Sequence, residues 1–219
     1  NPQETEEDDL YVYAPASIFG THCSPRLDYD QITGLIQSEA SVLDLGCGRG
    51  SLLVKLRANG NRRHMGIELN EEDVFFCLQR GLDVVQADLN SGLAPFSDGQ
   101  FDYIVLSHTL QAVFDVEHLI REMLRVGRRS IVSFPNFAYQ KLRKMFIEQG
   151  KSPVSSGLLR HAWYNTPNIR FFSIADFEEF CRDRQITIHR RIALDTEENR
   201  VVSENANLTA DMAIFVISK

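Results

Sequence analysis

The stretch that decides the fold reads Val42-Leu43-Asp44-Leu45-Gly46-Cys47-Gly48-Arg49-Gly50-Ser51-Leu52-Leu53. Its first four residues form a largely apolar run that ends in glycine, which is typical of a buried parallel strand. Leu52, Leu53 and Leu56 then recur at helical spacing and predict a helix packed back on that strand. The stretch therefore predicts a strand, a tight turn and a helix that together open a doubly wound α/β domain.

The glycines of the turn, Gly46, Gly48 and Gly50, free its backbone to approach a ligand. A dinucleotide-binding turn has the spacing G-x-G-x-x-G/A, and here the third glycine comes one residue early, which disfavours an NAD(P)-dependent oxidoreductase. With Asp44 in the acidic slot the pattern is (D/E)-x-G-x-G-x-G, which resembles the first motif of class I S-adenosylmethionine-dependent methyltransferases. In that superfamily the turn passes under the methionine part of the cofactor, so the acid faces a cation. The alternative is a tight turn that binds nothing.

An acid closes the second predicted strand, His64 to Leu69. Glu68 lies roughly twenty residues beyond the glycines, where nucleotide-binding sheets place a carboxylate that accepts both ribose hydroxyls. Cys47 and Leu69 complete this part of the expected cofactor site. The alternative is a solvated carboxylate beside the helix cap Asn70.

The third predicted strand, Asp83 to Leu89, also ends near an acid. By resemblance to the superfamily, the carboxylate of Asp88 meets the adenine amino group and the backbone N–H of Leu89 reaches the adenine ring. Acids at the ends of three successive strands indicate an S-adenosylmethionine site more specifically than any one of these acids does alone.

The fourth predicted strand, Phe101 to Leu106, runs into Ser107 and His108. Its end lies at the topological switch point of the sheet, so these residues are expected to face the cofactor's sulfonium. Ser107 is a predicted cofactor contact, and His108 is a candidate general base because its pKa lies near neutral pH. A hydrogen-bonded histidine in the wall of the site is the alternative. Arg26 is a candidate cation for the cofactor's carboxylate, or a solvated surface residue.

The remaining pattern completes a single domain from residue 10 to 219. We expect a helix over 71–80 with Val74, Phe75, Cys77 and Leu78 as its core stripe, and a polar loop over 197–207 between two final strands. The irregular segment of about 150–170, which holds the only tryptophan, is expected to be a lid. The fold class is α/β, a three-layer Rossmann-like methyltransferase fold. By resemblance, its seven-stranded, mostly parallel sheet has the order 3-2-1-4-5-7-6 with one antiparallel strand.

Composition sets further limits on the function. The chain has 219 residues, a formal net charge of -7 and a pI near 5.4, which oppose a nucleic-acid partner. The acidic residues 1–9 predict a disordered tail. No apolar run is long enough to cross a membrane and no signal peptide is recognisable, so a cytoplasmic protein is expected. The four cysteines are scattered without metal-ligand spacing and predict free thiols and no metal site.

Five stretches resemble one family, that of methionine biosynthesis protein W (MetW), and the last three of them are not general methyltransferase motifs. They are Val42-Leu43-Asp44-Leu45-Gly46-Cys47-Gly48, Leu106-Ser107-His108-Thr109-Leu110-Gln111-Ala112, Met123-Leu124-Arg125-Val126-Gly127-Arg128-Arg129, Ser133-Phe134-Pro135-Asn136-Phe137 and Trp163-Tyr164-Asn165-Thr166-Pro167-Asn168-Ile169. The chain departs from the family at Arg49, where an acid is usual, and at His108, where glutamine is usual.

The resemblance implies a protein of methionine biosynthesis that binds S-adenosylmethionine, and its product S-adenosylhomocysteine, and acts with homoserine O-acyltransferase. The alternative is a working methyltransferase on a small-molecule acceptor, since methyl transfer depends mainly on proximity and alignment.

Overall fold

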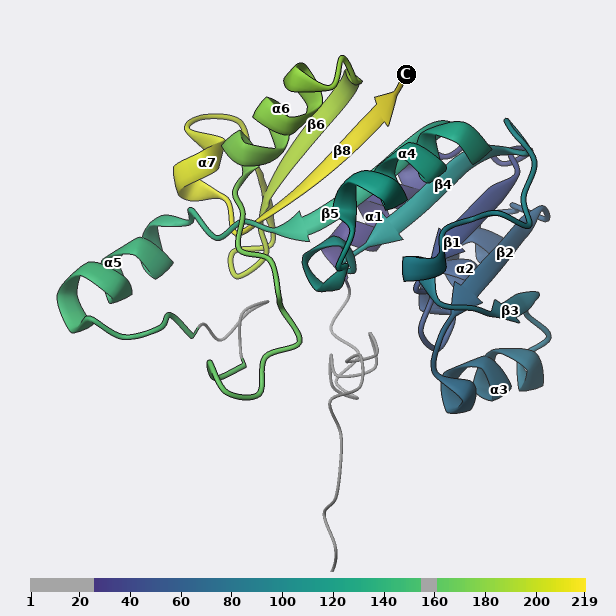
Figure 1. Cartoon of the computed structure of the whole chain (residues 1–219), viewed down its shortest axis with the longest axis horizontal. Helices are drawn as coiled ribbons and strands as arrows, with labels where there is room; N and C mark the ends of the chain where they lie inside the picture. The colour runs from purple at the N-terminus through teal and green to yellow at the C-terminus, as the bar shows by residue number, and fades with distance from the viewer. Residues whose placement is uncertain (1–25, 155–160) are drawn as a thin grey trace, which may run out of the picture.

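A computed structural model describes residues 26–154 and 161–219 (Figure 1). The predicted acidic tail, Cys23 and the middle of the predicted lid lie outside the described residues.

The sheet is mixed, and parallel over its first five strands. In spatial order it comprises β3 (Val84–Gln86), β2 (His64–Glu68), β1 (Val42–Leu45), β4 (Phe101–Ser107), β5 (Gly127–Pro135), β8 (Met212–Ser218), β6 (Thr187–Asp195) and β7 (Arg200–Val202). β8 runs antiparallel to both β5 and β6, and β7 runs antiparallel to β6. The carboxyl ends of β1 to β5 therefore share one edge, where the predicted site residues lie.

Helices cover both faces of this sheet (Figure 1). α1 (Leu27–Leu35), α2 (Ser51–Ala58) and α3 (Glu71–Gln79) contribute Ile32, Leu53 and Cys77 to one buried cluster. α4 (Val116–Val126) and α6 (Ile174–Asp183) contribute Met123 and Phe177 to the other. The predicted three-layer α/β class is thus confirmed, with α5 (Gln140–Gln149) projecting away from the layers.

The predicted strand count and loop need correction. The chain adds β7 at the far edge of the expected order, and the segment predicted as a polar loop over 197–207 contains β7 and the start of α7 (Ala206–Thr209). Buried Asp195 closes this hairpin by accepting hydrogen bonds from Glu198 N (3.2 Å) and Arg200 Nη2 (3.2 Å). The sequence pattern did not predict this hairpin, because the segment is polar and its turn is stabilised by a carboxylate and not by apolar packing.

The predicted core stripe of α3 is also only partly correct. Cys77 is fully buried, whereas Phe75 is 60% exposed and Leu78 is 54% exposed. The cause is the position of α3 beside the short edge strand β3, because within the described part of the chain β3 is the last strand on this side of the sheet and the outer half of the helix is left uncovered (Figure 1).

α4 passes into β5 without an intervening loop, since α4 ends at Val126 and β5 begins at Gly127. A Cβ on Gly127 would lie 2.4 Å from Cγ1 of Ile104 on the neighbouring strand, so only glycine fits this junction. Arg125, two residues earlier, donates to the carbonyl oxygens of Phe96 (2.8 Å) and Leu93 (3.1 Å) and so holds the connection between β3 and β4.

No helix in residues 26–154 or 161–219 has the length and apolar character needed to cross a membrane.

Candidate functional site

The glycine turn lies between β1 and α2 and is bonded to the neighbouring strand. Gly46, Gly48 and Gly50 have φ angles of 71°, 51° and 73°, in the left-handed region that favours glycine. The N–H groups of Gly46 and Cys47 both donate to Ile67 O, at 2.8 and 2.9 Å. A Cβ on Gly50 would lie 2.3 Å from Cδ1 of Leu82, so this glycine also permits the packing after α3. The turn is therefore a fixed element of the sheet edge.

Glu68 ends β2 as predicted, and its carboxylate faces the turn. Oε2 accepts from Gly48 N at 2.7 Å, and Oε1 accepts from Leu69 N at 2.8 Å and from Asn70 N at 3.0 Å. The side chain is only 3% exposed. The structure thus gives Glu68 a role that sequence reasoning missed, that of joining the glycine turn to the start of α3.

Asp44 is the last residue but one of β1 and is buried. The pKa of its carboxyl is raised to about 7, mainly by burial. The positive charge of Arg26 lowers this pKa, and the negative charge of Glu68 raises it. A nearby cation would stabilise the ionised form of this carboxylate, because burial has removed the water that would otherwise stabilise its charge.

Asp88 caps the short 3₁₀ helix Leu89–Ser91 at the end of β3. Its Oδ1 accepts from Asn90 N (2.9 Å) and Asn90 Nδ2 (3.0 Å), and Leu89 is buried behind it. The three predicted acids, Asp44, Glu68 and Asp88, therefore lie at or near the carboxyl ends of β1, β2 and β3.

Ser107 and Ser133 join the ends of the next two strands. Ser133 Oγ lies 3.1 Å from Ser107 Oγ, and Arg26 Nη2 donates to Ser107 Oγ at 3.3 Å. Arg26 also donates through Nε to Asp28 Oδ1 at 3.1 Å. The predicted cation Arg26 is therefore held in a salt bridge within its own segment.

Asp28 is a site residue that sequence reasoning missed. It is buried at the start of α1, and its Oδ2 lies 3.3 Å from Nε2 of His108. Burial alone would raise the pKa of Asp28, but His108 and Arg26 together hold it well below its usual range. The sequence carried no signal for this contact, because Asp28 and His108 belong to separate segments that only the tertiary fold brings together.

His108 is buried and has a left-handed backbone, with φ of 54°. Its N–H donates to Ser133 O at 2.9 Å and its carbonyl oxygen accepts from Gln111 Nε2 at 2.7 Å, which fixes this strained conformation. Burial, followed by the charge of Arg26, lowers the pKa of the imidazole, so the ring is neutral at pH 7. Because Asp28 is ionised, Nε2 of His108, which faces its carboxylate, carries the ring proton.

Gln111 joins the site to the segment predicted as a lid. The Ile169 and Arg170 N–H groups both donate to Gln111 O, at 3.0 and 2.9 Å. Its side chain is buried, and Oε1 has no hydrogen-bond partner among residues 26–154 and 161–219. The end of the predicted lid is thus fixed over the 3₁₀ helix that follows β4, while Trp163 within it is 74% exposed.

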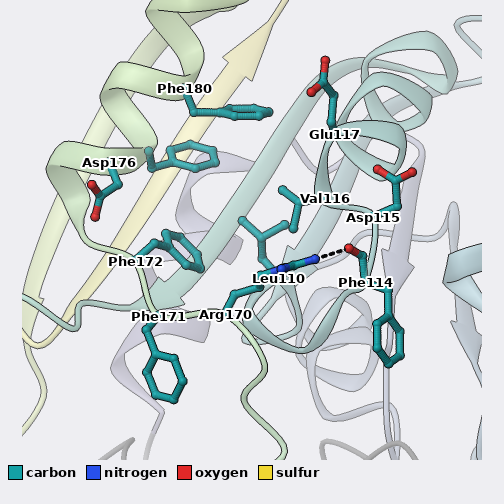
Figure 2. Close-up of a pocket in the computed structure, with 11 residues that line it drawn as sticks. Leu110, Phe114, Asp115, Val116, Glu117, Arg170, Phe171, Phe172, Asp176 and Phe180 are labelled. Carbon is teal, nitrogen blue, oxygen red and sulfur yellow. Dashed lines mark hydrogen bonds between the residues drawn. The ribbon is translucent and has the colours of Figure 1, made fainter.

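A groove of about 440 Å³ lies between α4 and α6 (Figure 2). Phenylalanine side chains dominate its lining: Phe114, Phe171, Phe172, Phe177 and Phe180. Arg170 crosses the groove and donates to Phe114 O (Figure 2). None of the predicted cofactor residues lines this groove.

This sheet order and these strand ends define a protein of the S-adenosylmethionine-dependent methyltransferase fold. A methyltransferase from Mesorhizobium loti has a TM-score of 0.66 at 15% identity, over 89% of this chain and 99% of that one. A methyltransferase from Aquifex aeolicus has a TM-score of 0.59 at 15% identity, over 88% and 90% of the two chains.

The chain belongs to the family described as methionine biosynthesis protein MetW, whose sequence pattern matches residues 26–217. It is 41% identical over 204 residues to the bifunctional methionine biosynthesis protein MetXA/MetW of Rhodopirellula baltica, covering 89% of this chain and 33% of that protein. Norajmaline N-methyltransferase of Rauvolfia serpentina is 36% identical over 94 residues, covering 40% of this chain and 32% of the relative. The chain therefore spans about a third of the length of these curated relatives.

Proposed function

We propose that the chain binds S-adenosylmethionine, and S-adenosylhomocysteine as its product, at the carboxyl ends of β1 to β4. The observation that carries this proposal is buried Asp44 near a turn of three glycines with positive φ. Asp44 has a pKa raised to about 7 by burial, so a bound ammonium group would relieve the cost of its ionisation. The carboxylate acceptors of Asp44, Glu68 and Asp88 fit a ligand that carries an ammonium, a ribose diol and an adenine amino group as hydrogen-bond donors.

The roles of the other residues follow from their positions. Glu68 would accept the ribose hydroxyls with the lone pairs that its three backbone donors leave available. Asp88 and Leu89 would meet the adenine edge, and Gly46, Cys47, Gly48, Gly50, Leu69 and Ser107 would form the walls. Arg26 is held in a salt bridge by Asp28, and we propose that Arg26 positions the side chains of Asp28 and Ser107.

We further propose that residues 10–219 form one domain in which the segment of about 150–170 closes over the ligand. The paired hydrogen bonds from Ile169 and Arg170 to Gln111 O support this role, because they fix one end of the segment directly after β4.

The protein partner that we propose is homoserine O-acyltransferase. Support comes from the Rhodopirellula relative, whose name joins MetXA to MetW in one bifunctional protein of methionine biosynthesis. The chain would then act chiefly by binding the cofactor and changing the activity of its partner.

Two measurements on the purified chain test this function. Calorimetric titration with S-adenosylmethionine should show binding, and NADH should not compete. Co-purification with homoserine O-acyltransferase, and that enzyme's rate with and without this chain, should show a complex and a changed rate. Absence of both the complex and the rate change would contradict the partner proposal and leave the cofactor proposal intact.

A second function, methyl transfer to a small molecule, is favoured by the Asp28 and His108 pair. S-adenosylmethionine would supply an electrophilic methyl group when bound. The ring of His108 is oriented by ionised Asp28 after the end of β4, which makes this pair the candidate general base. Release of S-adenosylhomocysteine on a metabolite panel, abolished in His108→Ala, would support this function over the accessory one.

A further inference from the structure

Two cysteines from separate elements meet at the glycine turn. Cys47 belongs to the turn and Cys77 to α3, and both are free thiols. Sγ of Cys77 donates to Gly48 O at 3.2 Å, and Sγ of Cys47 donates to the same oxygen at 3.7 Å. The hydrogen bond with Cys47 also lowers the pKa of the Cys77 thiol, so the two sulfurs interact with each other. The fold therefore places two thiols together at one carbonyl of the candidate cofactor site.

Two glycines make room for these sulfurs. A Cβ on Gly66 would lie 2.5 Å from Sγ of Cys47, and a Cβ on Gly50 would lie 3.0 Å from Sγ of Cys77. The pair is thus packed where the turn, β2 and α3 come together. Cys77 is fully buried, whereas Cys47 is 6% exposed, so a small solute reaches the pair from the side of Cys47.

Gly48 connects the two thiols to the rest of the site. Its N–H donates to Glu68 Oε2 at 2.7 Å, while its carbonyl oxygen accepts from both cysteines. A disulfide has no S–H group, so oxidation of the pair would remove both hydrogen bonds to this oxygen. Gly48 is buried, and loss of the donors to a buried acceptor costs free energy unless the backbone moves. Oxidation would therefore disturb the turn.

We propose that Cys47 and Cys77 are a redox pair, whose reversible disulfide loosens the glycine turn and weakens cofactor binding. The effect on binding rests on the proposed function, whereas the disulfide and the change in the turn do not depend on it.

The reaction takes hydrogen peroxide as its oxidant. One sulfur, as its thiolate, attacks a peroxide oxygen; the O–O bond breaks, a sulfenic acid forms, and the leaving hydroxide takes up a proton to become water. The other thiol then gives up its proton, and its sulfur attacks the sulfenic sulfur, so that the S–S bond forms and the sulfenic oxygen leaves as a second water. Two thiols are oxidised and one peroxide is reduced to two waters. A dithiol reductant reverses the reaction by thiol–disulfide exchange.

Peptide mapping of the full chain tests the disulfide. After treatment with hydrogen peroxide and alkylation of the remaining thiols in denaturant, we expect a link between Cys47 and Cys77 that dithiothreitol removes. Cys181 on α6 is the control thiol, because it is also fully buried and should remain open to alkylation. Two alkylated thiols at positions 47 and 77, or a disulfide to Cys23 or Cys181 in place of the expected one, would overturn the proposal.

Hydrogen exchange and calorimetry measure the consequence for the turn. In the oxidised chain the amides of residues 46–50 should exchange faster, and affinity for S-adenosylmethionine should fall about tenfold, the effect of one lost hydrogen bond. Dithiothreitol should restore both values. If the reduced chain does not bind S-adenosylmethionine, the proposed function fails, while mapping and hydrogen exchange still decide on the redox pair.

A serine variant separates the disulfide from other oxidative damage. Cys77→Ser should bind like the reduced parent and be unaffected by peroxide, because its hydroxyl can donate to Gly48 O but cannot form a disulfide. Cys181→Ala is the matched control and should lose affinity with peroxide as the parent does. Equal loss in Cys77→Ser and the parent would overturn the proposal, as would a disulfide that leaves both hydrogen exchange and affinity unchanged. Mapping and hydrogen exchange of the parent need no variant, so they test the pair even if Cys77→Ser does not fold.

Discussion

The imidazole of His108, after β4, and the carboxylate of Asp28, at the start of α1, meet in the buried interior with His108 Nε2 3.3 Å from Asp28 Oδ2. Arg26 holds the other side of the same carboxylate. One buried acid thus orients both the candidate base and the cation beside it, so α1 is part of the site and not only a cover for the sheet.

Asp28→Asn should destabilise the protein by at most about 3 kcal/mol at pH 7, because it leaves Arg26, which is 30% exposed, without its partner. The pKa of Asp28 is lowered in the folded state, so its contribution is present above the unfolded value near 3.8 and is lost as the pH falls below it. Urea unfolding should show a constant difference from the parent between pH 7 and pH 5 and a smaller one at pH 3.5. Asp30→Asn in the same helix, at a half-exposed side chain, should change stability little.

Asp44→Asn should remove the pH dependence of S-adenosylmethionine binding below neutral pH. In the free protein Asp44 has a pKa of about 7, so below that pH a cationic ligand must displace a proton from it. Parent affinity should fall about fivefold as the pH drops from 7 to 6, because the ionised fraction of Asp44 falls by that factor, while Asp44→Asn binds weakly at both values. Calorimetry checks this, with exposed Asp83→Asn as the control. An unchanged slope in Asp44→Asn would assign the titration to another group, such as His108.

Glu68→Ala should lower both cofactor affinity and stability. The carboxylate holds three backbone N–H groups, and loss of one charged hydrogen bond costs about 1.5 to 3 kcal/mol, or roughly tenfold or more in affinity for each ribose contact. Thermal melting and calorimetry separate the two effects, and exposed Glu72→Ala is the control. Reduced stability with unchanged affinity would reject the ribose role and leave the structural one.

Residues 152–168 should become protected when S-adenosylmethionine binds. The following residues, Ile169 and Arg170, are fixed to Gln111 O, whereas Trp163 is 74% exposed, so this segment can close about a fixed end. Trp163 is the only tryptophan, and its fluorescence together with hydrogen exchange of the segment reports closure. No change in either on saturation with ligand would contradict the lid.

The sequence predicted those features that depend on local patterns. The apolar run before Gly46, the periodic leucines after it and the acids that follow β2 and β3 all lie where the pattern indicated, because each reflects one strand or turn. Local chemistry suffices for such elements.

Features that depend on neighbours could not be predicted. Periodicity marked Phe75 and Leu78 as core, but burial requires a strand beneath them, and β3 is the edge of the sheet. Asp28 looks like any polar residue in a first helical turn until the fold brings His108 beside it. The three backbone donors of Glu68 depend in the same way on the turn geometry around Gly48.

The absence of a loop between α4 and β5 means that the helix and the strand form one continuous segment of the chain. The start of α4, at Val116 and Glu117, forms a wall of the phenylalanine-lined groove, and β5 carries Ser133, which contacts Ser107 in the site. At the junction Gly127 packs closely against Ile104, and β5 itself is hydrogen-bonded to β4 on one side and to β8 on the other. The groove wall and the serine pair are therefore built from the same segment, whose position the sheet fixes from both sides.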